Sequence, residues 1–199
     1  MQIKNCNNVD DFRKMAKSRL PSPLFHYIDG GADDELTLKR NTKAYDDYFL
    51  VPNGLSDVAN INLSTKILGQ KVNSPLFLAP SGMNRLFHHD GERATSRAAE
   101  KYGSYYSLST LSSVSIEEIG KLTKSPKMFQ IYIHKDRALT YELIDRCKKA
   151  NFTSLCLTID TIVAGNRERD LRSGMTMPPK FTLASLFSFV CDHVGYLTI

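Results

Sequence analysis

Polar side chains crowd the sequence between Thr158 and Asp170. Thr158 and Asp160 lie at the end of an apolar run, residues 155–159, that predicts a short buried strand, and four consecutive charges follow at positions 167–170. The carboxyl end of a strand is where ligands bind in parallel α/β folds. A carboxylate buried there is costly without a partner. Asp160 is therefore a candidate site residue, and Arg167 in the following loop is another.

Three further predicted strands end in residues that could bind a ligand. Gln130 offers a donor and an acceptor together, which suits the pyrimidine edge of a flavin better than a phosphate. Gly82 has no Cβ, so the backbone beside it could approach a flat ring closely. The candidates at these strand ends are Ala79, Pro80, Ser81 and Gly82 after the first strand, Ser109 and Thr110 after the second, and Gln130 and Tyr132 in the third.

Four β/α units of about 25 residues must position these groups. Their strands are expected at 76–80, 105–110, 128–133 and 155–160, with helices at 90–102, from Ser115 and at 139–147. Asp90 is expected to cap the first of these helices, Gly103 to end it, and Ser115 with Glu118 to form a capping box. Shorter helices at 9–20, 22–28 and 33–45 and a hairpin at 61–72 precede the units.

The alternation of strands and helices predicts an α/β fold with a parallel sheet. A (β/α)8 TIM barrel has eight such units, so the chain is expected to hold about the first four after an N-terminal helical segment. The expected domains are a helical segment and connector at 1–60, the N-terminal half of a barrel at 61–190, and an atypical tail at 191–199.

Composition disfavours several other classes. The net charge is +5, but Lys and Arg are scattered among 21 acidic residues without long runs of like charge, so nucleic acid is not an expected partner. The spacing of His88, His89, Asp90 and Glu92 matches no common metal site, so no metal is expected. The four cysteines lack CxxC spacing and the N-terminus is too polar for a signal peptide, which suggests a cytoplasmic protein with reduced thiols. The apolar run at 181–191 is too short to span a bilayer, although peripheral contact with the inner face of the plasma membrane stays open.

Several segments occur in an order and spacing typical of one enzyme family. They are Tyr27 before Gly30-Gly31-Ala32, Leu78 to Gly82, Phe129 to Tyr132, Leu157 to Thr161, and Gly165 to Asp170 followed by Arg172, Gly174 and Pro178-Pro179-Lys180. From about residue 9 to about 182 the chain resembles the FMN-dependent α-hydroxy acid dehydrogenases and oxidases. The loop at 165–170 is most similar to that of the lactate-type enzymes, the L-lactate dehydrogenases linked to a cytochrome or quinone.

The resemblance implies a role for each matching residue. Ala79, Pro80, Ser81, Ser109, Gln130 and Thr158 would hold the isoalloxazine ring and ribityl chain of FMN. Tyr27 and Arg167 would bind the substrate carboxylate, while Tyr132 would hydrogen-bond the substrate hydroxyl or carbonyl oxygen. Asp160 would orient a catalytic histidine, so Tyr132 and Asp160 are the expected catalytic residues. The implied reaction oxidises a small L-2-hydroxy acid, most closely L-lactate to pyruvate, with a quinone, a cytochrome or oxygen as the electron acceptor.

The sequence also departs from the family. Its catalytic His, substrate Arg, the Lys beside flavin N1 and the glycine-rich phosphate site belong to barrel units that are not found here, and none of the five histidines takes the place of the base. The chain is thus expected to be a truncated form, inactive alone, of an enzyme that is a homo-oligomer when complete. A catalytically dead remnant and another FMN-dependent 2-hydroxy acid oxidase are the alternatives, although Leu111 replaces the aromatic residue usual in glycolate oxidases.

Simpler structural roles compete with the functional ones. Tyr27 could pack at the barrel rim, Gln130 and Thr158 could be ordinary hydrogen-bonding residues at strand ends, and the charges at 167–172 could form a solvated loop.

Overall fold

The chain forms two compact units, which we call the helical unit (residues 1–52 and 163–199) and the sheet unit (residues 53–162). This computed structural model describes residues 2–160 and 162–193, and side chains only as far as Val190. Thr161 and the side chains of the expected tail 191–199, Cys191 included, therefore lie outside the described residues. The division of the chain at 1–60, 61–190 and 191–199 stays a prediction.

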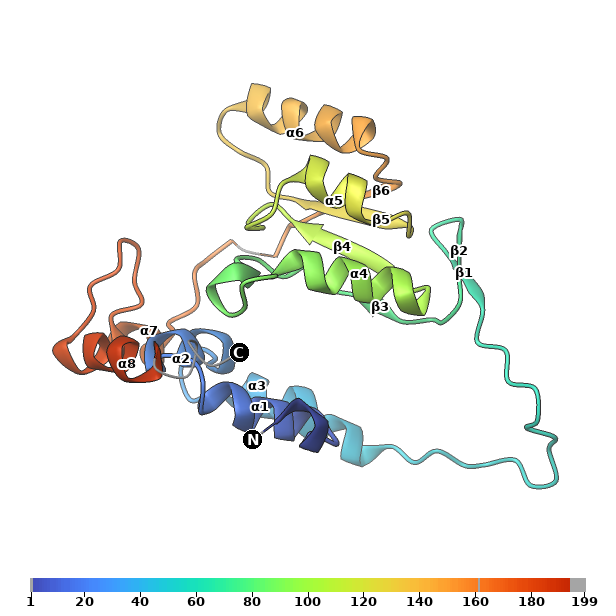
Figure 1. Cartoon of the computed structure of the whole chain (residues 1–199), viewed down its shortest axis with the longest axis horizontal. Helices are drawn as coiled ribbons and strands as arrows, with labels where there is room; N and C mark the ends of the chain where they lie inside the picture. The colour runs from blue at the N-terminus through green and yellow to red at the C-terminus, as the bar shows by residue number, and fades with distance from the viewer. Residues whose placement is uncertain (1, 161, 194–199) are drawn as a thin grey trace. The chain divides into compact units, whose positions relative to one another are not determined.

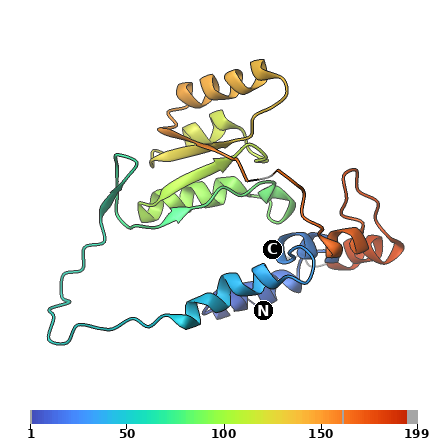
Figure 2. The ribbon, with the colours of Figure 1, turned by 180° about the vertical axis from the view of Figure 1, so that it is seen from behind.

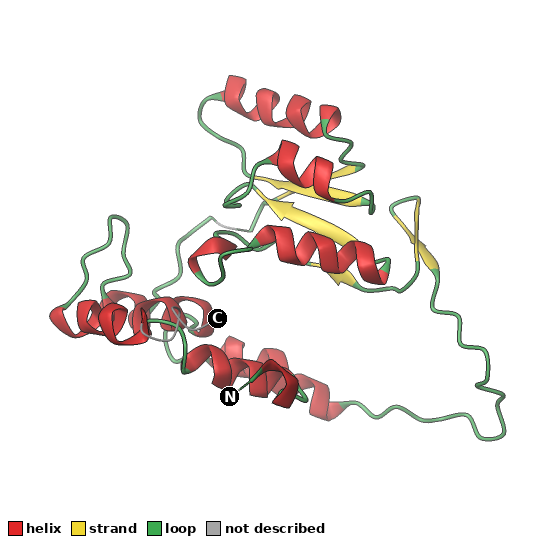
Figure 3. Ribbon diagram, in the orientation of Figure 1, coloured by secondary structure: helices red, strands yellow, loops and turns green. Residues whose placement is uncertain are grey.

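The sheet unit contains four parallel strands in the order β3-β4-β5-β6 (Figure 1). Helices connect them in sequence, as the predicted β/α units require (Figure 3). The strands are β3 Phe77–Leu78, β4 Tyr105–Ser109, β5 Lys127–Ile131 and β6 Ser154–Leu157, and the helices are α4 Glu92–Tyr102, α5 Ile116–Leu122 and α6 Arg137–Lys149. A short 3-10 helix, η3 Asn84–Leu86, lies between β3 and α4.

One face of this sheet carries the main hydrophobic core. Alternate residues of β4 and β5 point to the same side because side chains alternate along a strand. They pack against apolar side chains of all three helices, so α4, α5 and α6 cover that face. The core includes Tyr106, Leu108, Phe129 and Ile131 from the strands and Ala99, Ile116, Ile119 and Cys147 from the helices.

A β-hairpin packs against residues at the amino-terminal ends of β4 and β5. Its strands are β1 Thr65–Ile67 and β2 Gln70–Val72, which pair antiparallel as predicted for residues 61–72. Leu68 and Gly69 both have positive φ, 48° and 78°, as a two-residue turn of this kind requires. Val72 is buried against Tyr105 and Met128.

The predicted helix boundaries are partly correct. Gly103 ends α4 with φ 63°, and the Ser115 hydroxyl accepts a hydrogen bond from the Glu118 amide at the start of α5, both as expected. The other half of the capping box is missing, because the Glu118 carboxylate pairs with Arg93 instead. The expected cap of α4 is wrong: Gly91 occupies the N-cap position, and Asp90 pairs with Arg97 at 2.5 Å.

The expectation of a buried fourth strand is also wrong. Leu155, Leu157 and Ile159 are 45%, 53% and 78% exposed. Within the part of the chain that the structure describes, β6 pairs with β5 alone and forms an edge of the sheet. An apolar pattern predicts burial only if another element covers it, and no described element covers this one.

The helical unit joins segments from both ends of the chain. The N-terminal helices are α1 Val9–Lys17, α2 Ser22–Asp29 and α3 Leu36–Lys43, with 3-10 turns η1 Ile3–Asn5 and η2 Ala44–Asp47. They confirm the helices expected at 9–20, 22–28 and 33–45, and α2 ends at Gly30 as predicted. From the later part come α7 Glu168–Ser173 and α8 Leu183–His193, neither of which the sequence pattern predicted as a helix (Figure 2).

The open edge of β6 generates a prediction about association. Unpaired strand edges beside exposed apolar side chains favour pairing with another chain. We expect the molar mass from light scattering after size exclusion to rise with protein concentration. Leu157→Lys, which places a charge on the edge strand, should reduce this rise, whereas Leu63→Lys, at an exposed residue outside the strands, should not. A monomer at every concentration would contradict the prediction.

Candidate functional site

Gln130 links three strand ends in the sheet unit. Its Oε1 accepts hydrogen bonds from Ser109 Oγ at 3.0 Å and from the Thr110 amide at 3.2 Å. Its Nε2 donates to Thr158 Oγ1 at 2.6 Å. Parallel pairing brings the carboxyl ends of β4, β5 and β6 to one edge, so residues far apart in sequence form one row. The structure therefore brings together three of the predicted cofactor-binding residues.

The row presents donors to a ligand. Both acceptor positions of Gln130 Oε1 are occupied by Ser109 and Thr110. The expectation that Gln130 offers a ligand both a donor and an acceptor is therefore wrong, because only its donor is left. One N–H of Gln130 Nε2 has no acceptor among the described residues, and the Thr158 hydroxyl can donate its own proton while it accepts from Gln130. Complementary ligand atoms are therefore acceptors, such as the carbonyl oxygens and ring nitrogens of a flat heterocycle.

Glu92 is a buried residue that sequence reasoning weighed only as a metal ligand. Its carboxylate accepts from the Asn84 amide at 3.2 Å, the Ser113 amide at 2.9 Å and the Ser113 hydroxyl at 2.7 Å. Burial alone would raise the pKa of this carboxyl, but the hydrogen bonds from Ser113 and Asn84 outweigh it and leave the pKa below its ordinary value. Glu92 thus ties the loop after β3 to the loop after β4.

The residues after β3 lie along the same edge. Ala79 and Ser81 are exposed and Pro80 is half-buried. A Cβ added at Gly82 would lie 2.9 Å from the Leu111 Cβ, and the neighbouring Met83 amide donates to the Leu111 carbonyl at 2.8 Å. The absence of a side chain at position 82 therefore permits close packing of two loops, a reason other than the expected approach to a ring.

The two expected catalytic residues differ in how they are held. The Tyr132 amide donates to Thr110 Oγ1 at 3.2 Å, and its side chain is half-buried. Asp160 is exposed and makes no hydrogen bond or ion pair with any other described residue. The expectation of a buried Asp160 is corrected, because the chain after β6 runs at the open edge of the sheet.

In the helical unit, the structure brings together the two residues predicted to bind the substrate carboxylate. The Arg167 guanidinium lies over the Tyr27 ring, with its central carbon 5.2 Å from the ring centroid, and donates to the Tyr27 carbonyl oxygen. Asp170 accepts from Arg167 Nε at 2.5 Å. These contacts fix the orientation of the guanidinium on the Tyr27 ring.

The loop at 165–170 is docked on the N-terminal helices of the same unit. Asn166 exchanges a backbone and a side-chain hydrogen bond with Asp33, each 3.0 Å. Arg169 donates to Asp29 at 3.0 Å and also pairs with Glu35. The hydrogen bond from Arg13 is the main cause of the lowered pKa of Asp29, and Arg169 adds to it. The charges of this loop therefore form an ion-pair network with the N-terminal helices. The alternative prediction of a solvated loop is wrong for this part of the loop.

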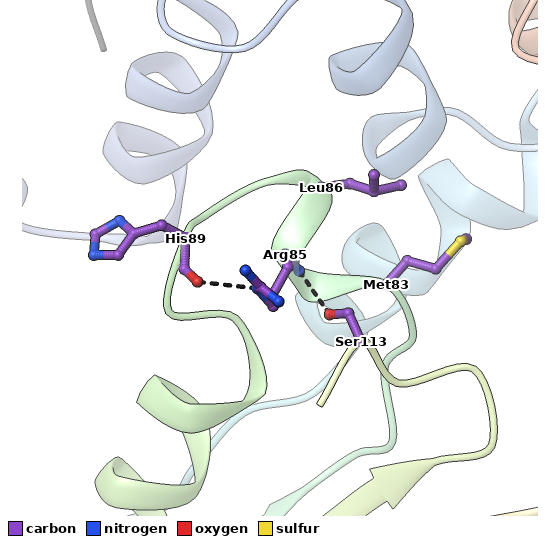
Figure 4. Close-up of a pocket in the computed structure, with 5 residues that line it drawn as sticks. All are labelled: Met83, Arg85, Leu86, His89 and Ser113. Atoms are coloured by element: carbon purple, nitrogen blue, oxygen red, sulfur yellow. Dashed lines mark hydrogen bonds between the residues drawn. The ribbon is translucent and has the colours of Figure 1, made fainter. Parts of the chain in front are cut away.

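A cavity of about 410 Å³ lies between the loops that Glu92 connects (Figure 4). The Arg85 amide donates to the Ser113 hydroxyl at 3.0 Å, and the Arg85 side chain to the His89 carbonyl at 3.3 Å. The His89 ring points away from Arg85, while Met83 and Leu86 lie on the opposite side (Figure 4). These side chains do not converge on one point, and none belongs to the predicted site.

The described residues thus contain two groups of candidates, each within its own unit. Ser109, Gln130, Thr158 and the main chain of Tyr132 form one group, and Tyr27 with Arg167 forms the other. Among the described residues no group of three or more His, Cys, Asp or Glu side chains is arranged to hold a metal ion.

A family model described as "FMN-dependent dehydrogenase" matches residues 16–197. That range includes most of residues 191–199, the segment predicted from the sequence to be an atypical tail. Among curated relatives, an L-lactate oxidase from Nostoc sp. is 43% identical over 183 residues, which cover 90% of this chain and 50% of the relative. Glycolate oxidase 1 from Oryza sativa subsp. indica is 38% identical over 176 residues, 88% of this chain and 48% of the relative. The chain spans about half the length of the curated relatives it matches.

Solved structures show the same likeness. A monotopic membrane protein, (S)-mandelate dehydrogenase, is 32% identical with a TM-score of 0.88, covering 96% of this chain and 51% of that one. A putative lactate oxidase from Pediococcus acidilactici is 36% identical with a TM-score of 0.82, covering 94% and 52%. These findings confirm the predicted resemblance and fold class.

Proposed function

The chain belongs to the FMN-dependent dehydrogenase family, and on that premise we propose that it supplies the ring-binding and carboxylate-binding groups for oxidation of an L-2-hydroxy acid. FMN is the cofactor of this family, and when bound it accepts the two electrons that leave the substrate. The row formed by Ser109, Gln130 and Thr158 carries the proposal. The two donors of this row that have no acceptor among the described residues fit the acceptor atoms of the isoalloxazine ring.

The remaining residues have complementary roles in the proposal. Tyr27 and Arg167 bind the substrate carboxylate, because a phenol and a guanidinium donate to its two oxygens. Tyr132 donates to the substrate oxygen at the reacting carbon. Asp160 orients a histidine base that the family resemblance assigns to a later barrel unit, and it stabilises the imidazolium that forms when this base takes the proton. Ala79, Pro80 and Ser81 line the ring from the loop after β3.

L-lactate is the proposed substrate. The L-lactate oxidase relative is 43% identical, compared with 38% for the glycolate oxidase. Leu111, in the loop after β4, is not the aromatic residue usual in glycolate oxidases. The complete protein is proposed to be a homo-oligomer that passes its electrons to oxygen, a quinone or a cytochrome.

The row formed by Ser109, Gln130 and Thr158 leads to a prediction about the affinity of the chain for flavins. Its contacts are to the ring, and no residue of this chain is assigned to the phosphate. We therefore expect riboflavin and FMN to bind this chain with equal, weak affinity in titrations of flavin fluorescence. Gln130→Leu should weaken both by about tenfold, the factor for loss of one hydrogen bond. Gln70→Leu, in the hairpin, is the control, and FMN bound more than tenfold tighter than riboflavin would contradict the assignment.

The catalytic roles predict distinct kinetics for two substitutions. Producing this chain together with the C-terminal half of the Nostoc L-lactate oxidase should give L-lactate oxidation to pyruvate, with glycolate and mandelate slower. In that assembly Asp160→Asn should lower kcat more than it raises KM, because an amide stabilises an imidazolium poorly. Tyr27→Phe should mainly raise KM, and Tyr45→Phe, at an exposed tyrosine of η2, should change neither. A raised KM with unchanged kcat in Asp160→Asn would refute the role of Asp160, and an unchanged KM in Tyr27→Phe would refute the role of Tyr27.

A second proposal concerns α8, whose polar face points inward. Ser185 is buried and donates to the Ser173 carbonyl at 2.8 Å, while Ser188 accepts from the Ser22 amide at 3.2 Å. Four large apolar side chains of α8 are exposed instead, with Leu183 at 86%, Phe187 at 69%, Val190 at 68% and Leu186 at 48%. None of the described helices is long and apolar enough to cross a membrane.

We propose that α8 lies on an anionic lipid surface, with its apolar face in the bilayer interface. The monotopic mandelate dehydrogenase shows that a structural relative is a membrane protein. Lys180, three residues before α8 in the sequence, adds a positive charge that anionic lipid would attract. The proposal places the protein peripherally at the inner face of the plasma membrane.

The membrane proposal predicts cosedimentation with vesicles. More protein should sediment with phosphatidylglycerol vesicles than with phosphatidylcholine vesicles, and added salt should reduce the difference. Phe187→Glu should reduce binding, because it places a carboxylate in the interface. Phe49→Glu changes a phenylalanine outside α8 that is even more exposed, and it should have little effect. Equal binding by the two variants would show that α8 does not make the contact.

A further inference from the structure

Thr110 continues the pairing of β4 and β5 past the point where their ladder ends. The last paired residues of the two strands are Ser109 and Gln130. Beyond them the Thr110 hydroxyl donates to the Gln130 carbonyl oxygen at 2.6 Å and accepts from the Tyr132 amide at 3.2 Å. The Thr110 side chain thus takes the place of a backbone partner in the ladder. Its hydroxyl holds the main chain at Tyr132, one residue beyond the end of β5 at Ile131.

The main chain of Thr110 adds a third contact. Its amide donates to Gln130 Oε1 at 3.2 Å and shares this oxygen with the Ser109 hydroxyl. One residue therefore fixes both the carboxamide of Gln130 and the main chain that carries Tyr132. The hydroxyl makes both side-chain bonds because one oxygen can donate and accept at once, a property that Ser shares with Thr and Val lacks.

The geometry points to Thr110 as a positioning residue that couples two parts of the site. It fixes the orientation of Gln130, a flavin-ring donor, and the backbone of Tyr132, the donor to the substrate oxygen; both roles rest on the proposed function. Because the three hydrogen bonds share one residue, a shift of the loop after β4 moves both groups together. The coupling sets the position of Tyr132 relative to the ring-binding row.

The test compares Thr110→Val, Thr110→Ser and Thr123→Val in the full chain. Val has nearly the shape of Thr but no hydroxyl, and Ser keeps the hydroxyl. Thr123 is the matched control, because its buried hydroxyl also accepts a backbone amide, that of Ser125 at 3.1 Å, but before the amino end of β5. The readouts are amide hydrogen exchange of Tyr132, the NMR signals of the Gln130 side-chain amide, and riboflavin affinity.

Thr110→Val should accelerate exchange at Tyr132 and weaken riboflavin binding, each by about tenfold, the factor for one lost hydrogen bond. It should also shift the Gln130 side-chain signals. Thr110→Ser should restore all three readouts, and Thr123→Val should leave them unchanged even if it lowers the melting temperature.

Two outcomes would overturn the assignment. In one, Thr110→Val leaves Tyr132 exchange and the Gln130 signals as in the wild type. In the other, Thr123→Val reproduces its effects, which would make the role purely structural. If the wild-type chain binds no riboflavin, the cofactor part of the proposed function fails. The exchange and NMR comparisons then still decide whether Thr110 couples Gln130 to Tyr132.

Discussion

The hydrogen bonds that Gln130 makes to both neighbouring strands hold together the group of candidate residues in the sheet unit. Its carboxamide has one acceptor oxygen and one donor nitrogen, and each bonds to a different strand end. This division is available only because β4, β5 and β6 are parallel and in register, so their carboxyl ends reach the same edge. The orientation of the donors toward a ligand depends on that pairing.

Residues whose roles depend on local chain geometry were predictable from the sequence. The strand order, the hairpin and the end of α4 at Gly103 follow from periodicity and turn chemistry. The grouping of Ser109, Gln130 and Thr158 follows from the rule that parallel strands end at one edge. Each of these inferences needs only neighbouring residues or the parallel arrangement of the strands.

The features that were missed depend on partners distant in sequence. In the sequence, Glu92 belongs to a stretch rich in acidic residues and histidine. In the structure, Ser113 in the loop after β4 donates two of the three hydrogen bonds that its carboxylate accepts. Arg169 forms ion pairs with Asp29 and Glu35, which lie more than a hundred residues earlier in the sequence. No local sequence pattern predicts such pairs. The burial expected for residues 155–159 was wrong. Alternation of apolar and polar residues predicts which side of a strand is apolar, but it does not predict whether another element covers that side.

The attachment of α8 has a thermodynamic consequence that follows from its inverted polarity. Its bonds to Ser22 and Ser173 are made by hydroxyls, while much of its hydrocarbon surface already faces water. Detaching this helix therefore exposes little new apolar area, so the heat-capacity change is small. The free energy gained by burying apolar surface weakens on cooling and grows on moderate warming. Hydrogen bonds made by hydroxyls do not gain in this way. Detachment of α8 should accordingly depend less on temperature than unfolding of the hydrophobic core does.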